Sequence, residues 1–252
     1  MTIRFLDSVT STNDAAWDEG RKGALRFVSV VADRQTQGRG RAGRAWDSPP
    51  GAGLYASSYV RLGWPPERAA FLTLAAGLAV RSALAQTLEV LPGIKWPNDL
   101  MAPDGSGRKL GGILTETRSE GGIIRDAVIG IGVNVRTPAS GWDVDADSRP
   151  VALDAWVAPD AIPDTRALAE PIVRELQREI ERLERGGPGD ILERARSAMP
   201  LWGRRVRGEQ GTRVLEGTAK DLAPDGGLVI RLDSGSEVVV HAGDVRVAWE
   251  GP

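Results

Sequence analysis

The segment over residues 67–88, ERAAFLTLAAGLAVRSALAQTL, constrains the fold more than any other part of the chain. It follows Pro65 and Pro66, and because proline is favoured at the start of a helix, the segment is predicted to be helical. Its apolar residues cover most faces of that helix, which is typical of a buried helix. The longest apolar run, residues 69–80, is too short to span a membrane. We therefore expect this helix to lie deep in a globular protein.

Strand-like segments surround this helix in the chain. Each is rich in β-branched residues or alternates apolar and polar residues. They cover residues 26–32, 53–61, 109–117 and 126–135, and GIKWPND at 93–99 holds a further short strand that the proline stops. A second, amphipathic helix is predicted over residues 165–184, capped by Asp164 or Thr165, and a short helix follows to about Met199. The main part of the chain is thus expected to hold strands around one long helix.

Beyond Leu201 the pattern changes to short β segments. PDGG at 224–227 and DSGS at 233–236 are typical of hairpin turns. We predict that residues 201–252 form a separate small β-barrel or sheet. A unit of this size usually depends on a larger neighbour, here residues 1–200.

The chain contains no cysteine and a single histidine, His241. Disulfides, thiolate nucleophiles and cysteine metal sites are therefore excluded, and so are zinc centres built on several histidines. Residues 1–12 lack the apolar core of a signal peptide, which together with the missing cysteines favours a cytoplasmic protein. A formal net charge of -2 and a pI near 5.7 argue against general nucleic-acid binding, which usually needs a basic face.

Residues 33–46, DRQTQGRGRAGRAW, carry four arginines and three glycines. Gly38, Gly40 and Gly43 satisfy the G-x-G-x-x-G pattern, but dinucleotide sites and Walker loops both need a helix to begin at the glycines. Here DSPPGAG and a strand follow Trp46 instead. Guanidinium groups on a glycine-rich loop suit a small anion, because each can bind two carboxylate or phosphate oxygens. We expect the loop to lack a packing anchor before Trp46 and to close over its ligand.

Four shorter motifs add polar groups and exposed backbone. STN at 11–13 precedes a helix-like stretch, and KWPND at 95–99 offers an amide and a carboxylate. GRKLGG at 107–112 and GIGVNV at 130–135 place glycines in strands, where a ligand could approach the backbone. Taken singly, each motif is explained as well by a helix cap, a turn or a strand. The basic loop taken alone is explained as well by a solvated surface loop.

Together, these motifs resemble, in order and spacing, those of the biotin protein ligases. The motifs are STN, GRGRAGRAW, KWPNDL, GRKLGGIL and VIGIGVNV, and they lie within residues 8–136. The resemblance implies an α+β fold in which a mixed or antiparallel sheet packs with helices, similar to class II aminoacyl-tRNA synthetases. Residues 1–200 would be the biotin- and ATP-binding catalytic domain, and residues 201–252 the small C-terminal β-barrel.

The resemblance also implies an activity. Proteins of this family join biotin to ATP, which gives biotinyl-5′-adenylate and pyrophosphate, and then transfer biotin to a lysine of a biotin carboxyl carrier protein domain. Biotin, ATP and Mg²⁺ are the expected ligands, and the carrier domain of a biotin-dependent carboxylase is the expected partner. We expect no nucleic acid or membrane partner, and a monomer or homodimer. Because STN begins at residue 11, no N-terminal DNA-binding domain is expected.

The motifs assign roles to individual residues by analogy. Lys109, Arg41 and Arg39 are the expected catalytic residues, because cations reduce the repulsion between the biotin carboxylate and the α-phosphate. The expected biotin site comprises Ser11, Thr12, Asn13, Gln35, Gly38, Arg39, Gly40, Arg41, Lys109, Gly111, Gly112, Gly130 and Gly132. The expected ATP site comprises Arg41, Arg44, Trp46, Lys95, Asn98, Asp99 and Asn134. Trp46 would cover the adenine, and Asn98 and Asn134 would read its edge. Asp99 is the candidate Mg²⁺ ligand and a candidate base for the carrier lysine.

Two other functions compete with this one. Lipoate ligases share the adenylate chemistry and differ mainly in pocket and loop, whereas octanoyl transferases need a cysteine nucleophile that the chain lacks. A non-enzymatic nucleic-acid or nucleotide module is disfavoured by the acidic total charge and by the lack of a second basic cluster with aromatic residues. Residues 137–160 match no motif, and we assign them no role.

Overall fold

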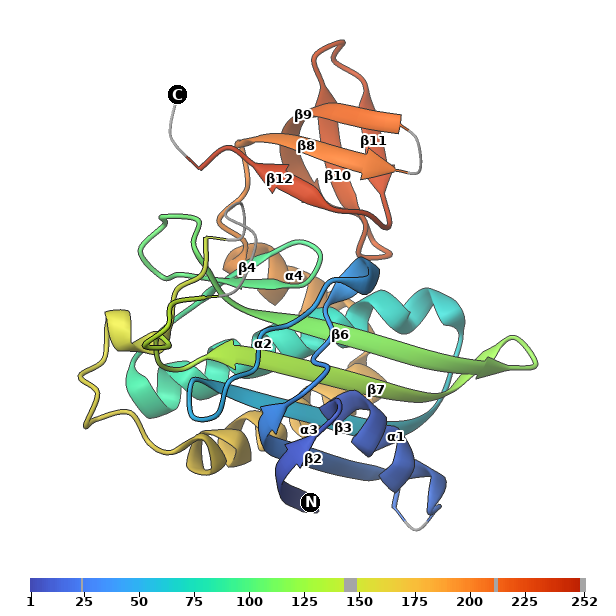
Figure 1. Cartoon of the computed structure of the whole chain (residues 1–252). Helices are drawn as coiled ribbons and strands as arrows, with labels where there is room; N and C mark the ends of the chain where they lie inside the picture. The colour runs from blue at the N-terminus through green and yellow to red at the C-terminus, as the bar shows by residue number, and fades with distance from the viewer. Residues whose placement is uncertain (24, 143–148, 211–212, 250–252) are drawn as a thin grey trace.

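The structure, a computed structural model, describes residues 1–23, 25–142, 149–210 and 213–249. A seven-stranded sheet in the order β1-β2-β3-β7-β6-β5-β4 forms its centre (Figure 1). The strands are β1 (Ile3–Val9), β2 (Phe27–Gln35), β3 (Gly53–Trp64), β4 (Gly93–Lys95), β5 (Asp99–Met101), β6 (Lys109–Glu120) and β7 (Ile123–Asn134). β1 and β2 are parallel, and the other neighbours are antiparallel. The expected mixed sheet is confirmed.

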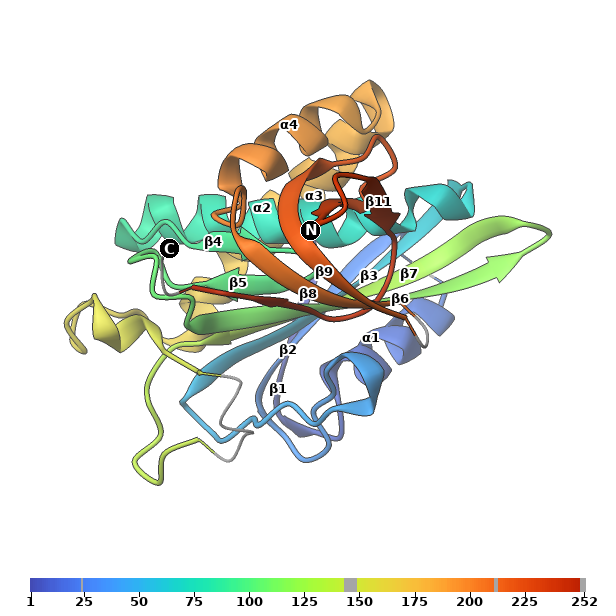
Figure 2. The same cartoon turned by 90° about the horizontal axis from the view of Figure 1, so that it is seen from above.

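Helices cover both faces of this sheet (Figure 2). α2 (Ala69–Leu88), α3 (Thr165–Gly186) and α4 (Gly189–Ala198) lie on one face, and α1 (Thr12–Arg21) lies on the other. α2 is apolar and long enough to cross a membrane by length and composition, but 61% of its most apolar window is buried inside the protein. That burial is typical of a core helix, so the expectation drawn from residues 67–88 is confirmed.

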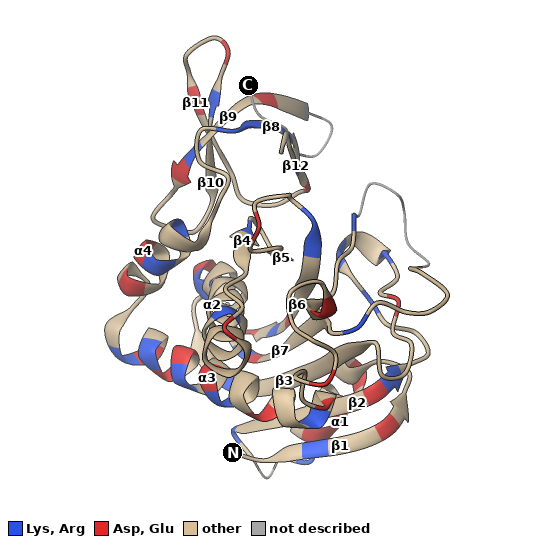
Figure 3. Ribbon diagram, turned by 90° about the vertical axis from the view of Figure 1, so that its left-hand side faces the viewer, with Lys and Arg blue, Asp and Glu red and all other residues tan. Residues whose placement is uncertain are grey.

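α3 follows the predicted amphipathic pattern. Its N-cap residue Asp164 accepts a hydrogen bond from the Ala167 backbone N–H at 2.7 Å. Its buried apolar side chains are Leu168, Ile172, Val173, Leu176, Ile180 and Leu183. Acidic and basic residues alternate along the rest of the helix (Figure 3), and several pair one turn apart, such as Arg174 with Glu170. The solvent side of α3 is therefore a surface of mixed charge.

A second, five-stranded antiparallel sheet lies beside the hairpin formed by β4 and β5 (Figures 1 and 3). Its order is β11-β10-β9-β8-β12. The strands are β8 (Arg205–Gln210), β9 (Arg213–Leu222), β10 (Leu228–Leu232), β11 (Glu237–Val240) and β12 (Val245–Val247). Among the described residues the end strands β11 and β12 do not pair, so this barrel-type sheet stays open. Trp96 Nε1 donates to the carbonyl of Gly226 at 3.0 Å, which ties the two sheets together.

The sequence patterns did not predict two strands, β1 and β5. The short strand expected before Pro97 is β4, which ends at Lys95, and β5 begins at Asp99 after a turn that contains a cis peptide bond between Trp96 and Pro97. β1 is an edge strand whose residues are mostly exposed, so it has little apolar pattern to detect. The division of the chain near Leu201 stays a prediction.

Candidate active site

One cavity of about 470 Å³ lies over the sheet face that α1 covers. It is bordered by β6, β7, the β4–β5 hairpin, residues 36–47 (the arginine loop) and the edge of the C-terminal sheet. The predicted site residues that line it are Ser11, Thr12, Asn13, Gln35, Arg39, Gly40, Arg41, Arg44, Trp46, Lys95, Asn98, Asp99, Lys109, Gly112, Gly130, Gly132 and Asn134. Gly38 and Gly111 are not among its lining residues. A Cβ at Gly111 would lie 2.5 Å from the Gly132 carbonyl oxygen, so that glycine serves strand packing.

One end of the cavity, here called the polar end, is formed by Ser11, Thr12, Asn13 and Gln35. The first three are buried at the start of α1, where Ser11 is the N-cap and accepts a hydrogen bond from the Asn13 backbone N–H. Gln35 Oε1 accepts from the backbone N–H of Thr12 at 2.8 Å and from its hydroxyl at 3.0 Å. The polar end therefore places hydroxyl, amide and carbonyl groups within one buried network.

Two more residues complete the polar end. The buried Ser57 hydroxyl lies 2.7 Å from Thr12 Oγ1 and 2.6 Å from Asn13 Oδ1, although no motif contained it. A Cβ at Gly130 would lie 2.3 Å from Asn13 Oδ1. Gly130 is therefore required so that the Asn13 amide can lie flat against β7.

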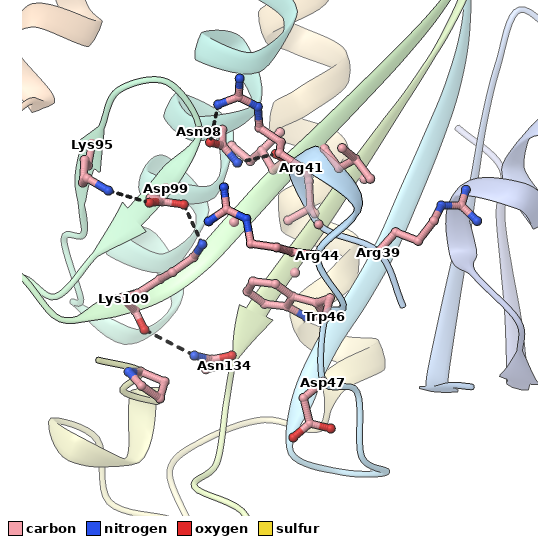
Figure 4. A pocket seen from close by; sticks show the side chains of 18 of the residues that line it. Arg39, Arg41, Arg44, Trp46, Asp47, Lys95, Asn98, Asp99, Lys109 and Asn134 are labelled. Atoms are coloured by element: carbon pink, nitrogen blue, oxygen red, sulfur yellow. Dashed lines mark hydrogen bonds and ion pairs between the residues drawn. The ribbon is translucent and has the colours of Figure 1, made fainter. Parts of the chain in front are cut away.

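The other end of the cavity holds two lysines around one carboxylate (Figure 4). Lys109 Nζ lies 2.6 Å from Asp99 Oδ1, and Lys95 Nζ lies 3.0 Å from Asp99 Oδ2. The Asp99 side chain is only 14% exposed. Burial alone would raise the pKa of Asp99, but the two ammonium groups outweigh it and hold the pKa below the usual 3.8. The three groups together carry one net positive charge.

This arrangement argues against both further roles expected for Asp99. A carboxylate with a lowered pKa is a weak base, and both of its oxygens already face ammonium groups. A direct Mg²⁺ contact would have to displace a lysine, so Asp99 as arranged does not fit a metal ligand. Among the described residues no group of three or more His, Cys, Asp or Glu side chains could hold a metal ion.

The three arginines of the loop diverge (Figure 4). Arg39 turns away from Lys109 and forms two hydrogen bonds of 2.7 Å with Asp14, plus a 3.3 Å contact with Glu116. These bonds hold the pKa of Asp14 below 3.8 and raise the pKa of Arg39. The expected clamp of Arg39 with Arg41 is therefore not formed in this structure, because two carboxylates hold Arg39 at α1 and β6.

The other two arginines contact the C-terminal sheet. Arg41 donates to Asn98 Oδ1 at 3.2 Å and to the carbonyl of Gly243 at 3.4 Å. Arg44 forms an ion pair with Asp244. The expectation that the arginine loop lacks an anchor before Trp46 is wrong, because each loop arginine has a partner outside the loop.

The Trp46 indole lies flat against the backbone of Gly112 and Gly132, where the absence of side chains leaves room for it. A Cβ at Gly132 would lie 2.6 Å from Trp46 Cε2, and one at Gly112 would lie 3.2 Å from Cζ3. Lys109 Nζ is 5.5 Å from the centre of the indole ring, close enough for a cation–π contact. Trp46 Nε1 is the one buried side-chain N or O atom without a hydrogen-bond partner in the described part of the chain. Two glycines expected in the biotin site, Gly112 and Gly132, therefore accommodate an indole here, which leaves a donor for a ligand to satisfy.

The two asparagines expected to read adenine are held by backbone groups. Asn98 Nδ2 donates to the Ile113 carbonyl at 2.9 Å. Asn134 Nδ2 donates to the carbonyls of Lys109 at 3.3 Å and Val151 at 3.0 Å. Both amide nitrogens thus help to fix the strands around Lys109.

Several lining residues fall outside every motif. Residues Trp142, Arg149 and Pro150 come from the region to which no role was assigned, and Asp244, Val245, Arg246, Val247 and Trp249 come from the C-terminal sheet and its end. A Cβ at Gly107 would lie 2.1 Å from Trp249 Cγ, so this tryptophan packs onto the turn before Lys109. No periodic pattern marks these residues, because they meet the cavity only through the tertiary fold.

Known proteins with similar sequences identify the family of this chain. Residues 5–134 match the sequence model of the biotin/lipoate A/B protein ligase family, and residues 202–247 match that of the biotin protein ligase C-terminal domain. A biotin–(acetyl-CoA-carboxylase) ligase of Mycobacterium tuberculosis is 38% identical, over 96% of this chain and 88% of that protein.

Two solved structures have the same fold. The biotin protein ligase of Aquifex aeolicus in complex with biotin and ATP has a TM-score of 0.79 at 25% identity, and the match covers 98% of this chain and 99% of the other. The biotin protein ligase of Leishmania major in complex with biotinyl-5-AMP has a TM-score of 0.64 at 28% identity, covering 96% and 99%. From the family match and the relative aligned over nearly its whole length, this chain belongs to the biotin protein ligases of the biotin/lipoate A/B protein ligase family.

Proposed function

We propose that this protein is an ATP-dependent ligase that activates biotin as biotinyl-5′-adenylate and transfers it to a lysine of a biotin carboxyl carrier protein domain. One observation carries the proposal: a single cavity joins the buried polar end to the lysine pair around Asp99. A cyclic urea needs donors and acceptors together, and two reacting anions need cations. The cavity supplies the first at one end and the second at the other.

In the first step, a carboxylate oxygen of biotin forms a bond to the α-phosphorus of ATP. The bond from that phosphorus to the oxygen leading to the β-phosphate breaks, and pyrophosphate leaves. Both reactants are anions, so positive charge fixed beside the reacting oxygens lowers the barrier. We assign this role to Lys109, which Asp99 holds in place, with Arg41 and Lys95 beside it. Arg39 would join them only after release from Asp14.

In the second step, the neutral amine of the carrier lysine attacks the acyl carbon of the adenylate. The bond between that carbon and the phosphate oxygen breaks, AMP leaves, and the amine loses a proton. No side chain of the enzyme serves as a nucleophile, which is consistent with the absence of cysteine.

Mg²⁺ would enter this cavity with the triphosphate and would not be held by Asp99, because both oxygens of that carboxylate are engaged by lysines. When bound there, Mg²⁺ would offset negative charge on the pyrophosphate. The carrier domain of a biotin-dependent carboxylase is the inferred macromolecular partner, and the cytoplasm is the inferred compartment.

A direct assay tests the proposal. The purified protein is mixed with ATP, Mg²⁺ and either biotin or lipoate, and pyrophosphate and the mass of a carrier-domain acceptor are measured. Pyrophosphate release and a mass increase with biotin are expected. Activity with lipoate but not biotin would assign the protein to the lipoate ligases, and activity with neither would overturn the proposal.

A further inference from the structure

A series of partly buried hydrogen bonds connects the polar end of the cavity to the backbone of Trp46. It passes through Ser48, which is 4% exposed and belongs to no motif considered above. The Ser48 hydroxyl lies 2.9 Å from Gln35 Nε2 and 3.0 Å from the Trp46 carbonyl oxygen. Gln35 in turn contacts Thr12 through its amide oxygen. Four residues thus connect the start of α1 to the arginine loop.

The number of available protons fixes the direction of these bonds. Two Thr12 donors point at one end of the Gln35 amide, so that end is the oxygen and the other end is the nitrogen. The nitrogen donates to Ser48, whose single hydroxyl proton is then left for the Trp46 carbonyl. Ser48 accepts from Gln35 and donates to Trp46, so a displacement of the Gln35 amide moves the Ser48 hydroxyl and weakens its bond to the Trp46 carbonyl.

Gly38 also packs against the Trp46 carbonyl. A Cβ at Gly38 would lie 2.4 Å from that carbonyl oxygen and 2.7 Å from Ser48 Oγ, and the Trp46 N–H donates to the Gly38 carbonyl at 2.9 Å. The backbone of Trp46 is therefore fixed between Gly38 and Ser48. Because the indole begins at that backbone, the same contacts set its position over Gly132.

We propose that Ser48 is a positioning residue that makes the placement of Trp46 depend on whether the polar end is filled. This inference rests on the proposed function, in which the group at the polar end is the urea of biotin. A urea carries N–H donors and a carbonyl acceptor, so it competes for the Gln35 oxygen and the Thr12 hydroxyl. Because Ser48 is hydrogen-bonded to both Gln35 and the Trp46 carbonyl, this competition changes the hydrogen bond that holds Trp46.

Fluorine NMR of protein labelled with 5-fluorotryptophan tests this role, and Trp46→Phe identifies the Trp46 resonance. Biotin alone is expected to shift that resonance in the wild-type protein and not in Ser48→Ala. In Ser48→Ala, KM for ATP is expected to rise about tenfold while kcat changes less than about twofold, because two partly buried hydrogen bonds are lost away from the reacting atoms. Ser58→Ala is the matched control, because it removes another buried serine hydroxyl, paired with Ser29 at 2.7 Å, and is expected to behave as wild type.

Further variants separate positioning from folding. If Ser48→Ala does not fold, Ser48→Cys replaces it, since a thiol is similar in size but a weak donor. Ser48→Thr keeps the hydroxyl and is expected to restore the shift. A biotin-induced shift in Ser48→Ala equal to that of wild type would overturn the proposal. The proposal would also be overturned if biotin binds but shifts the Trp46 resonance neither in the wild-type protein nor in any variant. Absence of biotin binding to the wild type by calorimetry would instead overturn the proposed function, and this inference with it.

Discussion

Lys109 Nζ and Asp99 Oδ1 lie 2.6 Å apart, and the second oxygen of the same carboxylate faces Lys95. The carboxylate comes from the first residue of β5 and Lys109 from the first residue of β6, so neighbouring strands fix the pair. Asp99 positions Lys109 and also neutralises part of the charge that two lysines would otherwise place together. What remains is one net positive charge facing the cavity.

Lys109→Ala is expected to reduce the rate of adenylate formation by a factor on the order of 10²–10³, as is usual when one electrostatic contact to a transition state is lost. The fold should persist, because Asp99 keeps its contact with Lys95. Pyrophosphate release measures the rate, and thermal unfolding reports the fold. Lys220→Ala, which removes an ion-paired lysine of the C-terminal sheet, is the matched control. Normal turnover in Lys109→Ala would contradict the assignment.

Asp99→Asn is expected to destabilise the protein by about 3 kcal/mol at pH 7, because it leaves two largely buried ammonium groups without their carboxylate. The folded-state pKa of Asp99 is lowered below 3.8, so the stability it provides is present above that pH and is lost as the pH falls through the folded pKa. The difference between wild type and variant should therefore be constant from neutral pH to about pH 5 and shrink below about pH 4.

Urea unfolding at several pH values measures this difference. Asp160→Asn, at an exposed position, is the control and should change stability little. A difference between wild type and Asp99→Asn that stays unchanged down to pH 3 would show that the carboxylate charge of Asp99 is not what stabilises the fold.

The main elements of the fold could be predicted from local patterns. The apolar residues of α2 cover most of its faces, which specifies a buried helix, whereas those of α3 recur at the helical period, which specifies a helix packed on one side. β1 was missed since an exposed edge strand needs no apolar alternation. β5 was missed because it is a strand of three residues directly after a turn.

The sequence predicted which residues line the candidate site better than it predicted how those residues are arranged. The glycines and charged residues of the motifs include most of the residues that line the cavity. The sequence alone does not show which carboxylate forms an ion pair with each arginine. Arg39 meets Asp14 and Glu116, which come from α1 and β6, and Arg44 meets Asp244 of the C-terminal sheet. These partners depend on long-range packing, as does the position of Trp46 over Gly132.

Gly132→Ala is expected to destabilise the protein by about 1–3 kcal/mol, because the new methyl group would overlap the indole of Trp46. In a Trp46→Ala background the same change should be close to neutral, since the overlapping group is gone. Urea unfolding of the four proteins completes a double-mutant cycle. Gly63→Ala, in β3 with open space around it, should be near neutral in both backgrounds. Equal effects of Gly132→Ala in both backgrounds would contradict the contact with Trp46.

Asp244→Ala is expected to loosen the arginine loop without weakening the fold. The Arg44–Asp244 ion pair links the arginine loop to the C-terminal sheet. Because both side chains are more than half exposed, the pair contributes only about 0.5 kcal/mol to the free energy that holds the loop in place. Loss of that contribution should roughly double the rate at which trypsin cleaves after Arg41 and Arg44 in the ligand-free protein, while the melting temperature stays within about 2 °C. The rates are followed by mass spectrometry.

Asp233→Ala is the matched control, because it removes another exposed ion-pair partner, that of Arg205, from the same C-terminal part of the chain without touching the loop. Biotin with ATP should protect the loop from trypsin in the wild-type protein, since a bound adenylate would offer the loop arginines new anionic partners. If Asp244→Ala and Asp233→Ala are cleaved at the wild-type rate, the ion pair does not restrain the loop. If biotin with ATP gives no protection, the arginine loop does not close over the ligand.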